Sequence, residues 1–151
     1  MSMFNKYKIL MYHVDGLPYR HNSGVNLTFD SDFQNITFKE FMSKKPEVIL
    51  PISKIVRAGT VKTEDIVSGN MIGRAAVGGL IFGGAGAIVG AMSAQERKKV
   101  TYLYCINYVS DGEEKAIVLK SGGDISEMKF RRKLSELLPH EEIVNDGPIV
   151  L

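Results

Sequence analysis

The chain has little of what would point to a secreted protein. Only one of its 151 residues, Cys105, is a cysteine, so no disulfide can form within the chain. A protein without disulfides suits the reducing cytosol. Residues 1–14 mix lysines into a strand-like pattern and lack the continuous apolar stretch of a signal peptide. These absences predict a cytoplasmic protein, in which we expect Cys105 to be a small buried side chain and not a nucleophile.

Residue patterns of catalytic or metal-binding sites are also missing. The three histidines, His13, His21 and His140, are scattered, and neither an HxxH nor a CxxC pair occurs. Asp30 and Asp32 are better explained as turn formers than as a pair of catalytic carboxylates. We therefore expect a protein that is not an enzyme and that has no catalytic residues, no metal site and no cofactor.

The charge is too small to predict binding to nucleic acid. The formal net charge is +2, whereas nucleic-acid-binding domains concentrate Lys and Arg on one surface. Short basic clusters occur at 44–45, 97–99 and 129–133. The last cluster is explained most simply as a solvated helix face, and contact with an anionic partner is the alternative.

What the sequence does contain is a run of 20 uncharged residues at 75–94, AAVGGLIFGGAGAIVGAMSA. Wound as an α-helix, six of its small residues fall within an arc of about 100°. This small-residue stripe consists of Ala75, Gly79, Gly83, Gly86, Gly90 and Ala94. Glycine weakens a helix by roughly 1 kcal/mol relative to alanine, so such a stripe favours close approach of another backbone. The segment 71–94 is therefore predicted to be a glycine zipper, either one helix or a helical hairpin bent at 83–84.

A nucleotide-binding loop is a minor alternative for the same segment. Gly84, Gly86 and Gly90 give the spacing GxGxxxG, which differs from the dinucleotide fingerprint GxGxxG. No Lys-Ser or Lys-Thr pair follows any of these glycines, as a phosphate-binding loop requires. The spacing thus argues against an enzyme that cradles a nucleotide.

The residues on either side carry the pattern of one β-rich domain. Strand-like runs occur at 7–14, 25–30, 36–41, 48–56, 100–109 and 115–120. Pro51 marks an edge or a bend, and Asp111-Gly112 is a hairpin-turn signal. A helix is predicted over 125–138, with Asp124 or Ser126 as its cap and Pro139 after its end. Its predicted apolar face consists of Ile125, Met128, Leu134, Leu137 and Leu138.

Six strand-like runs followed by a terminal helix resemble, in this order, the pleckstrin-homology (PH)-like superfold, and particularly the bacterial PH-like or GRAM-like domains. The resemblance covers 4–58 and 100–139. It implies an α+β, mostly β fold, in which a small open barrel or bent antiparallel sheet is plugged by the C-terminal helix. It also implies a seventh strand, for which 60–67 is the candidate, and a binding or scaffold role without catalysis.

The chain 1–151 is then expected to be a single domain. Its sheet would come from 4–58 and 100–121, its helix from 125–138 and its glycine-zipper insertion from 71–94, and 140–151 would be a tail. Because both flanks build one sheet, the insertion cannot be a single bilayer-spanning helix, which would separate them. Positive charge at both ends of the segment agrees with this expectation, since such charge favours the cytoplasmic side. The flanking cations are Arg74, Arg97, Lys98 and Lys99.

Two hypotheses for function follow from this organisation. In the first, the protein is a scaffold or binding module whose partners are further copies of itself, joined through the small-residue stripe, and an unidentified protein. In the second, it is a peripheral membrane protein at the inner face of the membrane. The glycine-rich segment would then enter one leaflet while the flanking cations contact anionic headgroups.

Overall fold

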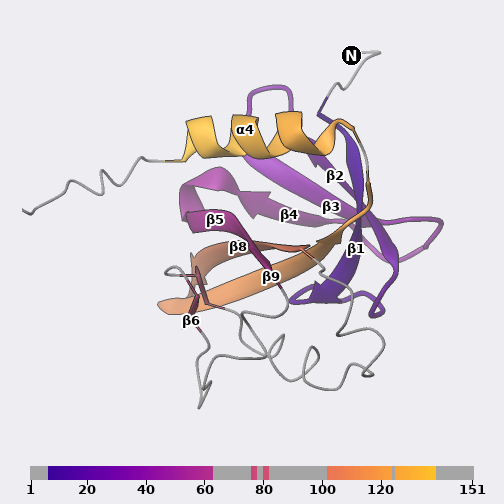
Figure 1. Ribbon diagram of the computed structural model, residues 1–151, viewed down its shortest axis with the longest axis horizontal. Helices are drawn as coiled ribbons and strands as arrows, with labels where there is room; N and C mark the ends of the chain where they lie inside the picture. Colours follow the sequence, from indigo (N-terminus) through magenta and orange to yellow (C-terminus); the bar gives the residue numbers. More distant parts are fainter. Residues whose placement is uncertain (1–6, 63–75, 78–79, 82–101, 124, 139–151) are drawn as a thin grey trace, which may run out of the picture.

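The computed structural model describes residues 7–62, 76–77, 80–81, 102–123 and 125–138. Seven strands of these ranges form one antiparallel sheet, and a single α-helix lies across it (Figure 1). The strands are β1 (Ile9–Asp15), β2 (Gly24–Phe29), β3 (Asn35–Glu40), β4 (Val48–Pro51), β5 (Ile55–Lys62), β8 (Tyr102–Ser110) and β9 (Glu113–Ser121). The mostly β fold with a C-terminal helix is confirmed.

The sheet joins the two flanks of the insertion. Its strand order is β4-β3-β2-β1-β9-β8-β5, so β1 pairs with β2 on one side and with β9 on the other. The edge strands β4 and β5 do not pair with each other, and the sheet therefore remains open. Residues 63–101 leave and re-enter the sheet at one point, because Lys62 at the end of β5 pairs with Tyr102 at the start of β8.

The run 48–56, predicted as one extended segment, is two strands separated by a 3-10 turn, η1 (Ile52–Lys54). Pro51 ends β4 at this turn, as expected of a proline at a bend. The second of these strands, β5, is the seventh strand of the sheet. It extends to Lys62, so the candidate region 60–67 contributes only its first residues to β5 within the described part of the chain.

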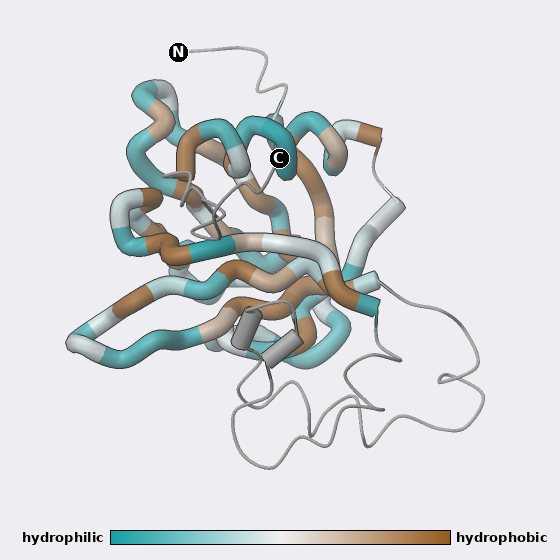
Figure 2. The backbone as a smooth tube through the Cα atoms, turned by 60° about the vertical axis from the view of Figure 1, so that its left-hand side comes forward, coloured by the Kyte–Doolittle hydropathy of each residue, from teal (hydrophilic) through white to brown (hydrophobic). Residues whose placement is uncertain are grey.

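Alternation along the strands builds the core on the face that meets the helix. In β2, Val25, Leu27 and Phe29 are buried, while the residues between them are partly exposed. The same alternation of hydrophobic and hydrophilic residues runs along other strands (Figure 2). Side chains from β1, β2, β3, β5, β8, β9 and α4 (Glu127–Leu137) join in one hydrophobic cluster.

The helix α4 lies on this cluster through a face that agrees with the predicted one at Leu134 and Leu138 but not at every position. Phe130, Leu134 and Leu138 are buried, at the spacing i, i+4 and i+8 that shares one side of a helix. Ile125 and Met128, predicted to face the core, are 92% and 70% exposed. Ile125 precedes the helix, and Met128 lies on the side of α4 away from the Phe130 stripe. The apolar face predicted from sequence is therefore wrong at these two positions.

The predicted limits of the helix are close to the observed ones. Ser126 is the N-cap residue, although its side chain makes no capping hydrogen bond, and Asp124 lies outside the described residues. Leu137, predicted to be buried, is only partly buried against the cluster. The predicted tail 140–151 lies outside the described residues.

Four positions of the glycine-rich segment are described, and they form strands. The short strands β6 (Ala76–Val77) and β7 (Leu80–Ile81) pair as an antiparallel hairpin, with Val77 opposite Leu80. In the sequence, Gly78-Gly79 separates them, a dipeptide typical of two-residue hairpin turns. A continuous helix starting at Ala75 is therefore wrong for these four positions. The rest of the segment lies outside the described residues.

Candidate functional site

The residues predicted to form the zipper and its charged flanks lie outside the part of the chain that the structure describes. They are Ala75, Gly79, Gly83, Gly86, Gly90 and Ala94 of the small-residue stripe, and Arg74, Arg97, Lys98 and Lys99. Their roles in assembly or in membrane contact thus remain predictions. Three surfaces of the described residues bear on function: the sheet face beside the insertion, the β3–β4 loop and the basic side of α4.

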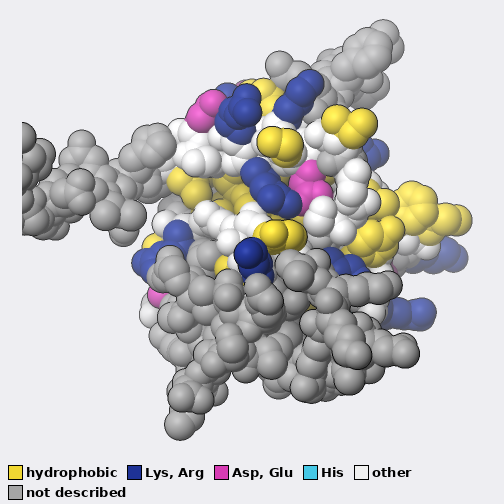
Figure 3. All heavy atoms as spheres, in the orientation of Figure 1, with side chains coloured by type: hydrophobic (Ala, Val, Ile, Leu, Met, Phe, Trp, Pro, Cys, Tyr) yellow, Lys and Arg dark blue, Asp and Glu magenta, His cyan; other side chains and the backbone are white. Residues whose placement is uncertain are grey.

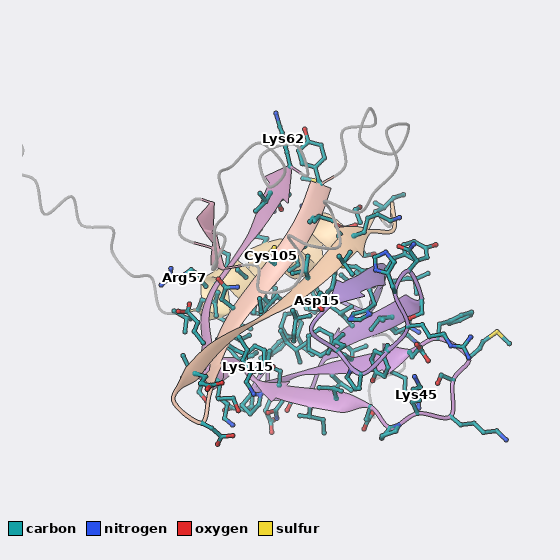
Figure 4. All side chains as sticks on the ribbon, turned by 90° about the horizontal axis from the view of Figure 1, so that it is seen from below. Asp15, Lys45, Arg57, Lys62, Cys105 and Lys115 are labelled. Atoms are coloured by element: carbon teal, nitrogen blue, oxygen red, sulfur yellow. The ribbon has the colours of Figure 1, made fainter. Side chains whose placement is uncertain are left out.

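The first surface lies on β5, β8 and β9, on the side away from α4. It is made by Gly59, Val61, Leu103, Cys105 and Val118, which we call the outer face. In the sheet register Cys105 lies opposite Gly59 on one side and Val118 on the other. The apolar side chains of this group are all buried, although none of them belongs to the core cluster beneath α4. Figure 4 looks toward this side of the sheet and labels Cys105 on β8.

The hairpin β6–β7 adjoins this outer face. Cα atoms of β7 lie within 8 Å of Cα atoms in β8 and in β5. The hairpin forms its own two-stranded sheet and does not extend the seven-stranded sheet at an edge. In Figure 1 the hairpin overlaps the left-hand ends of β8 and β9 and lies well apart from α4. The insertion thus begins beside the one sheet face that the core does not use.

Cys105 is the only cysteine of the chain and has no exposed surface. Its burial raises the pKa of the thiol to about 12, so almost none of it is thiolate near neutral pH. A thiol in this state is a poor nucleophile. The prediction of a buried cysteine with a packing role is confirmed.

The second surface is the loop between β3 and β4, which exposes two large apolar side chains. Phe41 is 57% exposed and Met42 is 91% exposed, and the exposed Lys44 and Lys45 follow them. We call residues 41–45 the apolar loop. Hydrophobic and basic side chains lie together at the right edge of Figure 3. The strand pattern 36–41 includes Phe41, whereas β3 ends at Glu40. The signal for this loop was an apolar pair separated by one serine from a basic pair.

The backbone holds the apolar loop in a costly conformation. Met42 has φ 53°, in the left-handed region that residues with a Cβ rarely adopt. Such conformations cost of order 1–3 kcal/mol and persist only where surrounding contacts impose them. The Tyr19 hydroxyl supplies such contacts, 3.0 Å from the carbonyl oxygen of Phe38 and 2.9 Å from that of Pro46. These contacts fix both ends of the loop to the β1–β2 connection.

The buried carboxylate of Glu40 ties the same two loops together. Its Oε2 accepts a hydrogen bond from the backbone N–H of Arg20 at 3.1 Å. Hydrogen bonds from Ser43 and then Ser23 hold the pKa of the Glu40 carboxyl below its usual value. Glu40 is therefore ionised near neutral pH and joins the β1–β2 connection to the start of the apolar loop.

His13 orders the β1–β2 connection from inside. Its Nε2 accepts a hydrogen bond from the Leu17 N–H at 3.1 Å, and its Nδ1 lies 3.1 Å from the Arg20 carbonyl oxygen. A carbonyl oxygen can only accept, so Nδ1 carries the proton and the imidazole is neutral. Burial lowers the pKa of His13, which agrees with this neutral form. His13 therefore serves the loop and not a metal.

The third surface is the basic side of α4. Lys129, Arg132 and Lys133 line, with Tyr7 and Glu136, a shallow pocket of about 200 Å³. The Lys133 ammonium lies 4.6 Å from the ring centre of Phe33, which lies in the turn between β2 and β3. These cations lie on the accessible side of the helix and suit an anionic partner or solvent.

Arg131, in the same basic run, is used inside the fold instead. Its Nη2 is paired with Oε1 of Glu127, and its Nη1 donates to the Thr60 hydroxyl at 3.0 Å. Its guanidinium also lies 5.2 Å from the ring centre of Tyr104. The second oxygen of Glu127 accepts a hydrogen bond from Ser121 at 2.7 Å. Arg131 and Glu127 thus attach α4 to β5, β8 and β9.

Among the described residues, no three His, Cys, Asp or Glu side chains gather as metal ligands would. The only helix in the described ranges, α4, falls well short of the length and apolar character that crossing a bilayer requires.

The comparisons with known proteins agree with this architecture. The family model of a glycine zipper containing PH domain matches residues 18–120, from the β1–β2 connection through the insertion into β9. No match was found among curated proteins or solved structures. The resemblance of the element order to PH-like domains is confirmed, and the chain belongs to the family of PH domains that contain a glycine zipper.

Proposed function

We propose that this protein is a non-enzymatic binding or scaffold module that associates with further copies of itself through its glycine-rich insertion. The observation that carries the proposal is the position of Gly83, Gly86, Gly90 and Ala94, the part of the small-residue stripe that follows the β6–β7 hairpin, inside the range matched by the PH family model. Small residues four and three positions apart let two backbones approach closely, and their close packing drives association. The proposed partners are therefore other copies of the chain.

The way in which the insertion is attached supports this role. Lys62 and Tyr102 are paired neighbours in the sheet, so both ends of the insertion are held at one place. A segment held in this manner begins and ends at one place on the domain, as an assembly element would. The same attachment argues against a single membrane crossing, because its two ends would lie on opposite sides of the bilayer.

Light scattering coupled to size-exclusion chromatography tests the proposal on the full chain. Gly83→Leu places a bulky side chain on the stripe and should lower the mass in solution, although leucine improves intrinsic helix propensity by about 1 kcal/mol. Ile88→Leu, on the opposite side of the predicted helix, is the matched control and should leave the mass unchanged. A monomeric wild-type protein, or a mass that Gly83→Leu does not alter, would contradict assembly through the stripe.

A second candidate function is peripheral association with anionic membrane at the inner, cytoplasmic face. The observation that favours it is the apolar loop, where Phe41 and Met42 are exposed beside Lys44 and Lys45. Apolar side chains can enter the headgroup region while neighbouring lysines meet anionic lipid, at about 1 kcal/mol per lysine. Met42, with φ 53°, exposes its side chain at the tip of this loop.

Sedimentation with vesicles tests the second function. Wild-type protein should pellet with vesicles containing phosphatidylserine and much less with neutral phosphatidylcholine vesicles. Phe41→Ser with Met42→Ser should reduce the bound fraction. Ile49→Ser removes a side chain with the same 57% exposure as Phe41 from β4, outside the loop, and should bind as wild type does. Equal binding by all the variants would exclude the loop as the lipid contact.

A further inference from the structure

The side chains on the outer face of β5, β8 and β9 are buried, although this face lies on the side of the sheet away from the core. Leu103, Cys105 and Val118 are almost completely buried, yet they lie on the side of the sheet opposite to α4. Side chains of one strand alternate between the two faces, so the core cluster beneath α4 cannot be what buries them. A second layer must therefore cover the outer face.

The described chain offers one element for this layer. Cα atoms of β7 lie within 8 Å of β8, an interior strand of the sheet, as well as of the edge strand β5. A strand that extended the sheet would hydrogen-bond to β5, but the hairpin pairs only with itself. Proximity to an interior strand without pairing places β7 over a face of the sheet.

The residues of the outer face suit such an occupant. Gly59 lies opposite Cys105 in the register, and Val118 lies opposite Cys105 on the other side. Glycine, cysteine and valine leave a shallow apolar surface, on which a backbone can lie closely. The exposed Lys62 and the half-exposed Arg57 lie toward the two ends of β5, and the labelled Cys105 lies between them in Figure 4.

We propose that the outer face is an intramolecular docking surface, and that its occupant is the β6–β7 hairpin of the same chain. Docking removes the apolar side chains of Leu103, Cys105 and Val118 from water and holds the start of the glycine-rich insertion against the domain. The inference goes beyond assembly, because the hairpin docks within one copy whether or not the insertion associates with others.

Cys105 provides the test, because it is the only thiol of the chain and lies at the centre of the outer face. Its rate of alkylation by a maleimide in the native state reports how often the outer face opens. Leu80→Asp with Ile81→Asp should release the hairpin, because two charges on β7 would have to leave water for the hairpin to stay against an apolar surface. The matched control is Phe41→Asp with Met42→Asp, which adds the same charge to the exposed apolar loop.

We expect the hairpin variant to label about tenfold faster than wild type or more, while its far-UV circular dichroism stays β-rich. The loop variant should label at the wild-type rate. If the aspartates prevent folding, Leu80→Ala with Ile81→Ala takes their place, with a smaller rise in rate expected.

Two results would overturn the proposal. One is a folded hairpin variant in which Cys105 stays as protected as in wild type. The other is wild-type labelling that accelerates on dilution, because a cover that dilution removes belongs to another copy of the chain. A chain that is monomeric at every concentration and still protects Cys105 would refute the proposed assembly while supporting intramolecular docking.

Discussion

Replacing Phe130 by alanine tests how α4 is attached to the sheet. The Phe130 side chain has no exposed surface, and its ring stacks on that of Phe29 with centroids 4.5 Å apart and planes 19° apart. Truncating a buried phenylalanine costs about 3–5 kcal/mol, of which an aromatic pair can account for about 0.5–1.5 kcal/mol. The free energy of unfolding of an ordinary domain is about 5–15 kcal/mol, so Phe130→Ala should remove a large part of the stability of this domain.

Urea unfolding followed by circular dichroism measures the loss of stability. The comparison requires that the slope of the unfolding free energy against urea concentration is the same for both variants. Phe130→Leu keeps most of the apolar volume but loses the ring pair, and should cost roughly 1–2 kcal/mol. Met128→Ala is the surface control on the same helix and should change stability by less than about 0.5 kcal/mol.

A cost below about 1 kcal/mol for Phe130→Ala would contradict packing of Phe130 against the sheet, because it is well below the range for a packed phenylalanine. A cost for Met128→Ala as large as that for Phe130→Ala would contradict it as well. In the second case the face containing Ile125 and Met128, which the sequence pattern favours, would be the one that meets the sheet.

Three further predictions concern the loops. Gly16→Ala should cost well over 1 kcal/mol in urea unfolding, because φ is 98° and a Cβ would lie 2.1 Å from the Ala116 carbonyl oxygen; Gly112→Ala, with φ 77° but nothing within 4 Å, should cost less. Tyr19→Phe should cost about 1 kcal/mol and raise hydrogen exchange at the apolar loop, and an unchanged loop would contradict its anchoring role. The pKa of His13 in the folded protein is below its ordinary value of 6.5, so the unfolded chain binds more protons as the pH falls. The contribution of His13 to stability is therefore present above pH 6.5 and is lost as the pH falls below that value. His13→Gln should flatten this decline between about pH 7 and pH 5, and an equal decline in the variant would assign it to another group.

Local pattern was enough to predict most of the strands. The alternation in 25–30 predicts β2 because side chains of an extended chain point alternately to two sides, whatever the rest of the fold does. Asp111-Gly112 predicts a hairpin for an equally local reason. Asp111 has φ 53° and Gly112 has φ 77°, the left-handed values that a two-residue turn of this type requires.

The buried face of α4 could not be predicted in the same way. Apolar residues occur on more than one side of the helical sequence, so periodicity alone allows Met128 as well as Phe130 to face inward. The choice depends on Phe29, 101 positions earlier in the chain, whose ring lies where Phe130 can stack. Contacts between such distant residues leave no local signal.

The candidate functional surfaces likewise include features that local sequence predicts and features that only the folded chain shows. The sequence by itself determined that the chain carries a glycine-rich segment with zipper spacing between two β-rich halves, because composition and periodicity are local properties. The order of these elements carried the resemblance to PH-like domains. Only the tertiary structure decided that 76–77 and 80–81 form a hairpin, that this hairpin lies by β8, and that Phe41 and Met42 are exposed together. The place of the hairpin depends on the sheet register, which brings β5 beside β8 and gives the sheet a second apolar face, and the exposure of Phe41 and Met42 depends on the pairing of β3 with β4. A register is set by packing between segments far apart in sequence, and it exists only once the chain has folded.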